Sequence, residues 1–135
     1  MQEAYREPER SVVAAEAMHA IIGHRSRGEP LTPEAGIVRV ADALDMAHGR
    51  SRLPFEEGRP NIHTLSATAI EQVRILRGTK RPVRVEIEMN NSSGLFQVDE
   101  LLATKLRGSG IEEHAEVIAR IEAEHEKRLL PVFRI

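Results

Sequence analysis

The sequence contains no cysteine, no tryptophan and few other aromatic residues, and it has no long apolar run. The lack of cysteine excludes a disulfide framework, thiolate zinc ligands and a cysteine nucleophile, and it is typical of a reducing compartment. No apolar stretch approaches the roughly 18 residues that span a bilayer, and the first ten residues carry mixed charges where a signal peptide is apolar. We therefore expect a cytoplasmic protein that is not inserted in a membrane.

Neither sign of charge is in large excess. The chain has 19 Lys and Arg against 21 Asp and Glu, a formal net charge of -2, so no global positive field attracts nucleic acid. One Tyr and three Phe offer few surfaces on which unpaired bases can stack. Both observations argue against a nucleic-acid partner. What remains is a chain of 135 residues, 41% hydrophobic and 30% charged, which is typical of one compact domain with an aliphatic core.

The N-terminal half has the periodicity of helices. Val13, Ala17 and Ile21 recur at four-residue spacing, which predicts an amphipathic helix over residues 9–25 with these side chains on its apolar side. Its end is expected near His24, before a polar stretch that contains Gly28.

A second helix has a clear start signal. Thr32 provides an N-cap hydroxyl, and Pro33 suits the first helical position. We expect this helix to end near Gly49 and to carry Ile37, Ala41 and Leu44 on one face. Residues 48–62 then read as a long loop, a type of segment that is often functional.

The C-terminal half changes to a period of two. Apolar residues at 83, 85, 87 and 89 alternate with charged ones, which predicts a strand that forms a hairpin with residues 70–76. A helix is expected over 96–106. Residues 112–127 fit a helix by propensity and a strand by alternation, and 129–135 reads as a strand.

These elements predict an α+β fold, with N-terminal helices followed by a small antiparallel sheet on which one or two helices pack. The change in character near residue 65 suggests a helical region over 1–64 and an α/β extension over 65–135. We expect the two regions to share one compact unit.

His24 and Asp42 are the first candidates for chemistry. A histidine at the end of one helix and a carboxylate inside the next can converge on a divalent metal ion, since imidazole and carboxylate suit zinc, manganese or iron. The alternative is structural: His24 lies near the negative end of its helix dipole, and Asp42 pairs with Arg39 three residues back. Spacing alone favours the structural alternative.

Arg50 and Arg52 are candidates for phosphate binding, because guanidinium groups match phosphate oxygens in geometry. The alternative is a solvated loop whose charge is offset by Glu56 and Glu57. Glycine-rich phosphate loops, His-Glu-x-x-His and Gly-x-Ser-x-Gly are absent from the sequence, so the common nucleotide, zinc-protease and serine-hydrolase motifs do not apply.

Several of these residues lie in runs that point to one family. The segment AIIGHR at 20–25, followed by PEAGIVRVADALDM at 33–46, resembles the latter part of the HD superfamily of metal-dependent phosphohydrolases. The segments GRSR at 49–52, NIH at 61–63 and MNN at 89–91 extend the resemblance. It is strongest to uncharacterised prokaryotic members in which the helical HD core precedes a small α/β extension.

The resemblance implies hydrolysis of a phosphomonoester or nucleotide at a divalent metal ion (Mn, Mg, Zn, Fe or Ni). In that family a His, an adjacent His-Asp pair and a later Asp hold the metal. Asp42 resembles the later Asp, and His24 resembles a histidine that in some members joins the site or contacts phosphate. Arg50 and Arg52 would then contact the phosphate of a phosphorylated small molecule.

The chain departs from the family pattern at the His-Asp pair. Its only aspartates are Asp42, Asp45 and Asp99, and none follows a histidine. Three readings stay open: a partial chain, a partner half on a separate polypeptide, or a natural derivative that has lost catalysis and kept a binding or assembly role. Apolar helix faces left without the missing helices favour a homo-oligomer or a complex with the missing N-terminal half.

Overall fold

The computed structural model describes residues 6, 8–25, 27–46, 66–122 and 132–134. Helix α1 (Glu9–Gly23) and helix α2 (Pro33–Leu44) come first, followed by the hairpin strands β1 (Ile70–Arg77) and β2 (Val83–Met89). A 3-10 turn, η2 (Ser92–Gly94), leads into a helical segment formed by η3 (Gln97–Ala103) and α5 (Thr104–Leu106). Strands β3 (Ala115–Ile121) and β4 (Val132–Arg134) complete the fold, so the expected α+β class with helices before strands is confirmed.

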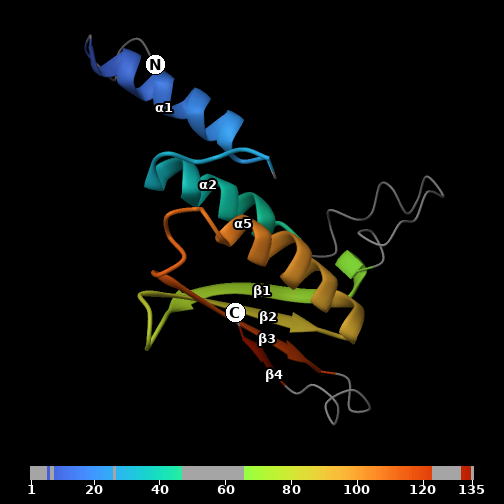
Figure 1. Ribbon diagram of the computed structural model, residues 1–135. Helices are drawn as coiled ribbons and strands as arrows, with labels where there is room; N and C mark the ends of the chain where they lie inside the picture. The colour runs from blue at the N-terminus through green and yellow to red at the C-terminus, as the bar shows by residue number, and fades with distance from the viewer. Residues whose placement is uncertain (1–5, 7, 26, 47–65, 123–131, 135) are drawn as a thin grey trace, which may run out of the picture.

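The molecule is layered (Figure 1). α1 is the outermost helix, α2 lies between it and the η3–α5 segment, and the sheet lies beneath. In the described ranges, none of the helices has the length and apolar character needed to cross a bilayer. The expected boundary at residue 64 and the long loop at 48–62 lie outside the described residues.

The sheet has the strand order β1-β2-β3-β4. β1 and β2 pair antiparallel as the predicted hairpin, with Val73 opposite Ile87. β2 and β3, however, pair parallel, with Val85 opposite Val117, and β4 returns antiparallel to β3. The expectation of a wholly antiparallel sheet was therefore wrong. The η3–α5 segment is a crossover between β2 and β3, and a helical crossover brings the next strand back in the same direction.

The expectation for 112–127 left helix and strand open. The structure describes this segment up to residue 122, and there it forms the strand β3 over 115–121. Five of the seven β3 residues are buried, because the strand is internal to the sheet. The helix expected over 96–106 is present, but its first seven residues form a π-helix.

One core joins α2, η3, α5 and the sheet. The buried apolar side chains that share it include those of Val40, Ala43, Ile87, Leu102 and Val117. α1 contributes to a separate contact, since it packs on α2 through the side that contains Ala20 and Gly23.

The two N-terminal helices do not bury the faces that their apolar spacing predicted. In α1, Ile21 is 65% exposed, and in α2, Ile37 is 54% exposed while Val40 and Ala43 are buried instead. α2 also ends at Leu44 rather than near Gly49. Both helices carry apolar residues on more than one side, so periodicity alone does not identify the side that is buried. The predicted N-cap is confirmed, because Thr32 Oγ1 accepts a hydrogen bond from the Ala35 N–H at 3.3 Å.

Candidate functional site

Asp42 lies two residues before the end of α2 and forms an ion pair with a lysine from a distant part of the chain. Lys105 Nζ, on α5, contacts Asp42 Oδ2. The lysine side chain is only 5% exposed, whereas that of Asp42 is 30% exposed. The carboxylate therefore already has a cationic partner at the position where the sequence suggested a metal ion.

His24 has a different partner. It caps the C-terminal end of α1, and its Nδ1 lies 2.6 Å from the Ile21 carbonyl oxygen, so this nitrogen donates to its own helix. His24 therefore hydrogen-bonds a carbonyl oxygen of its own helix, and Asp42 forms an ion pair with the ammonium group of Lys105. The described ranges contain no group of three or more His, Asp or Glu side chains that can hold a metal ion. Arg50 and Arg52 lie outside the described residues, so their phosphate contacts stay a prediction.

The described residues around Asp42 do not offer a donor set for a divalent metal ion. No group of three or more His, Asp or Glu side chains converges among them, and the positive ammonium group in contact with the Asp42 carboxylate opposes a second cation there. We therefore assign no reaction step to a metal held by the described residues.

The ion pair predicts unequal effects of removing its two members. Asp42→Asn leaves the Lys105 ammonium buried without its carboxylate and should cost about 2–3 kcal/mol of unfolding free energy. Lys105→Met leaves a carboxylate that water can reach, and should cost about 1 kcal/mol or less. Urea denaturation of both variants measures the difference. Equal losses would show that burial of Lys105 does not determine the cost.

Arg39 joins three segments of the chain, a role that was not predicted from the sequence. It is 6% exposed, and its guanidinium donates to the carbonyl oxygens of Lys105 at 3.2 Å, Arg25 at 3.3 Å, and Gly28. One side chain therefore ties the segment after α1, helix α2 and the end of α5 together. The placement of an arginine between Val38 and Val40 was the available signal, because a charge in an apolar helix requires buried partners.

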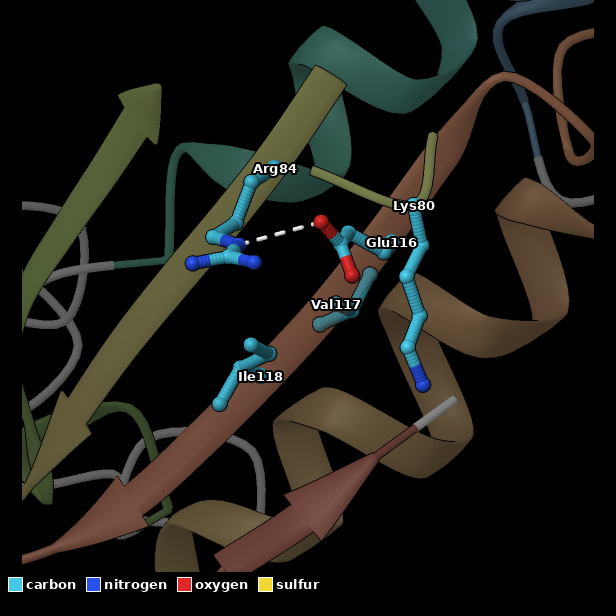
Figure 2. Close-up of a pocket in the computed structure, with 5 residues that line it drawn as sticks. All are labelled: Lys80, Arg84, Glu116, Val117 and Ile118. Carbon is cyan, nitrogen blue, oxygen red and sulfur yellow. Dashed lines mark hydrogen bonds and ion pairs between the residues drawn. The ribbon is translucent and has the colours of Figure 1, made fainter. Parts of the chain in front are cut away.

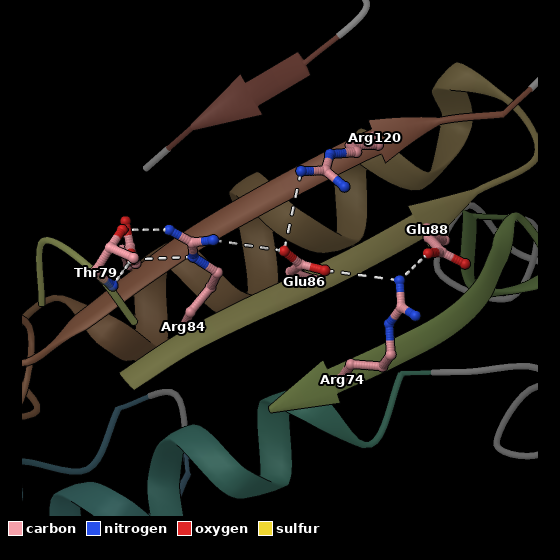
Figure 3. A network of polar contacts seen from close by, with 7 residues as sticks. Arg74, Thr79, Arg84, Glu86, Glu88 and Arg120 are labelled. Atoms are coloured by element: carbon pink, nitrogen blue, oxygen red, sulfur yellow. Dashed lines mark hydrogen bonds and ion pairs between the residues drawn. The ribbon is translucent and has the colours of Figure 1, made fainter. Parts of the chain in front are cut away.

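The opposite face of the sheet carries a ladder of charges (Figure 3). Glu86 on β2 lies 3.6 Å from Arg74 and 3.9 Å from both Arg84 and Arg120, while Glu88 also contacts Arg74. Because anions and cations alternate across neighbouring strands, each charge is offset by a neighbour. This arrangement is typical of a solvated sheet face.

A shallow hollow of 130 Å³ lies on this face, lined by Lys80, Arg84, Glu116, Val117 and Ile118 (Figure 2). Desolvation raises the pKa of Glu116, but hydrogen bonds from the Thr79 N–H and from Arg84 Nε, at 3.2 and 3.0 Å, stabilise the carboxylate, and the pKa lies below its ordinary value. Arg84, the arginine of this lining, already binds the Glu116 carboxylate. Its guanidinium is therefore not available to bind a second anion in the hollow.

The outer side of α1 is an exposed apolar surface. Three large side chains on this side are more than half exposed: Met18 at 62%, Ile21 at 65% and Ile22 at 67%. Sequence reasoning assigned Ile21 to the packed side and missed this surface. Scattered exposed apolar residues are ordinary, whereas contiguous apolar patches of several hundred Å² are typical of interaction sites.

Comparison with known proteins finds one curated relative. The chain is 39% identical over 124 residues to an uncharacterised protein of the archaeon Methanocaldococcus jannaschii. The match covers 92% of this chain but only 48% of the relative. The chain thus spans about half the length of the curated relative that it matches. No family model and no solved structure matches the chain.

Proposed function

We propose that this chain is a binding or oligomerisation module of HD-type descent, which acts through the outer side of α1. The observation that carries the proposal is the exposure of three large apolar side chains, Met18, Ile21 and Ile22, on a helix whose other side already packs on α2. α1 therefore carries apolar side chains on the side that faces away from α2 as well as small residues on the side that packs on it, which is typical of a helix with a second partner.

The Asp42–Lys105 pair supports the same proposal. In a metal site the carboxylate must be available as a ligand, whereas here a buried ammonium group holds it and contributes to the packing of α5 on α2. Asp42 is then a structural residue, and His24 a helix cap.

A second candidate is an HD-type phosphohydrolase that becomes complete only with ligands from outside the described residues. The observation that favours it is the length of the M. jannaschii relative, of which slightly more than half has no counterpart in this chain. In this candidate the chain contributes Asp42, and the phosphorylated substrate, a phosphomonoester or nucleotide, contacts Arg50 and Arg52.

Metal content and turnover separate the two candidates. We expect the purified chain to contain no stoichiometric Mn, Fe, Ni or Zn by elemental mass spectrometry, and to hydrolyse nucleotides no faster than Asp42→Asn when Mn²⁺ or Mg²⁺ is added. Asp45→Asn is the matched control, because Asp45 is an exposed aspartate three residues further along. One metal ion per chain, retained in Asp45→Asn and lost in Asp42→Asn together with turnover, would overturn the proposed function in favour of the phosphohydrolase.

A further inference from the structure

A chain of hydrogen bonds joins α1 to the start of α2 through two polar side chains, Glu16 and His19. They lie three residues apart on α1 and therefore share one side of the helix. Thr32 Oγ1, at the N-cap of α2, donates to Glu16 Oε2 at 3.0 Å and lies 3.4 Å from His19 Nδ1. At the other ring nitrogen, the Leu31 N–H donates to His19 Nε2 at 3.1 Å. The ring thus contacts two consecutive residues of the segment that leads into α2.

The direction of these hydrogen bonds fixes the protonation of the ring. A backbone N–H can only donate, so His19 Nε2 must present a lone pair to Leu31. The proton of the neutral ring is then on Nδ1, where Thr32 Oγ1 accepts it while the threonine hydrogen points to Glu16. The second lone pair of Thr32 Oγ1 accepts from the Ala35 N–H. Every donor in the chain therefore has an acceptor when the ring is neutral.

Protonation of His19 breaks one of these contacts and strengthens another. The second proton is added to Nε2, where it meets the Leu31 N–H, and two donors form no hydrogen bond with each other. At the opposite nitrogen, Nδ1 lies 3.7 Å from Glu16 Oε2, so the imidazolium gains an ion-pair partner on its own helix. Histidine changes charge between about pH 5 and 8, so both effects fall in the physiological range.

The charged groups around the ring come from α1, α2 and the segment between them. Among the described residues, Glu16 is the acid within ion-pair distance of His19. Glu29 in the connecting segment and Glu34 in the first turn of α2 are both exposed to solvent. Arg39 of α2 is buried, and its guanidinium donates to backbone carbonyl oxygens. Glu16 therefore determines where the protonated ring is held.

We propose that His19 makes the attachment of the segment before α2 dependent on pH. The neutral ring accepts from the Leu31 N–H and joins this segment to α1, whereas the protonated ring is held by Glu16 and releases Leu31. The contact is present above the pH at which the ring titrates and is lost below it. Because α2 is the main described neighbour of α1, this release weakens the hold on α1. The inference concerns the side of α1 that faces α2 and does not depend on what binds the outer side.

Nuclear magnetic resonance of the ¹⁵N-labelled full chain tests the proposal. We expect the proton of the His19 ring on Nδ1 at about pH 8, and a Leu31 amide signal that shifts with the same midpoint as the ring when the pH falls to about 5. His24 is the internal control, because its Nδ1 contacts the Ile21 carbonyl oxygen, and a protonated ring keeps that contact. A His19 proton on Nε2 at about pH 8, or a Leu31 signal that does not follow the titration of His19, would overturn the proposal.

Two substitutions separate the contacts of the ring. His19→Gln supplies an amide oxygen that accepts from the Leu31 N–H at every pH, so the pH-dependent shift of the Leu31 signal should disappear. Glu16→Gln removes the carboxylate that holds the protonated ring, so the midpoint of the Leu31 transition should move to lower pH by about half a unit. Glu34→Gln, at an exposed acid of α2, is the matched control and should leave the midpoint unchanged.

Circular dichroism of the three variants establishes that they are folded. A Leu31 transition that persists in His19→Gln would show that another group causes it. A midpoint that Glu16→Gln leaves in place, or that Glu34→Gln moves equally, would show that Glu16 does not hold the protonated ring. Either result would overturn the proposal.

Discussion

Gly36→Ala is expected to lower the unfolding free energy by about 3 kcal/mol, although alanine is the better helix former. Gly36 lies inside α2, and a Cβ placed on it would meet the backbone oxygen of Ser109 at 1.9 Å and the Ser109 carbonyl carbon at 2.9 Å. Ser109 is 1% exposed and lies between Gly108 and Gly110, which both have positive φ. Neither backbone can move away without disturbing the turn that follows α5.

Gly23→Ala is the matched control for this prediction. Gly23 is also helical, but a Cβ there meets Pro30 atoms at 3.6–3.8 Å, which is ordinary contact. Helix propensity should therefore stabilise this variant by about 0.5–1 kcal/mol. Urea unfolding of both variants gives the comparison. If Gly36→Ala were as stable as Gly23→Ala, the close approach of α2 to residue 109 would be wrong.

Arg39→Met is expected to cost about 3 kcal/mol. The substitution keeps most of the side-chain volume but removes the donor to the carbonyl oxygens of Arg25, Gly28 and Lys105. The Lys105 contact is buried, and an unsatisfied buried acceptor costs about 1–3 kcal/mol, whereas the Arg25 oxygen keeps the Gly28 N–H at 2.8 Å. The segment between α1 and α2 loses its fixed position, so the amide protons of α1 should exchange faster with solvent. Chemical denaturation and hydrogen exchange measure the two effects.

Arg27→Met serves as the control for this substitution, because Arg27 is exposed and lies in the same segment. It should change the unfolding free energy by less than about 0.5 kcal/mol. A similar small loss in Arg39→Met would show that the guanidinium does not join α1, α2 and α5.

The local elements of this fold follow from the sequence, and the long-range pairings do not. The Thr32-Pro33 start of α2 and the β1–β2 hairpin depend on neighbouring residues, and both were predicted. The parallel pairing of β2 with β3 depends on the helical segment between them. The order strand, helix, strand was the available signal for it.

The partners in the candidate site were not predictable from spacing. Asp42 and Lys105 are 63 positions apart, and Arg39 and Lys105 are 66 apart, so only the packing of α5 on α2 brings these groups together. The outer surface of α1 was missed for another reason. Val13, Ala17 and Ile21 have helical spacing, but Ala15, Met18 and Ile22 form an equally apolar stripe, and periodicity does not distinguish the packed side from the outer one.

Native mass spectrometry of the purified full chain tests the central claim most directly, because one spectrum reports both the number of copies and any retained metal ion. The account predicts an oligomer without a stoichiometric metal ion, which Ile22→Ser weakens and Ile75→Ser, at a similarly exposed position on β1, leaves intact. A monomer that carries one metal ion per chain, lost in Asp42→Asn but kept in Asp45→Asn, would contradict it.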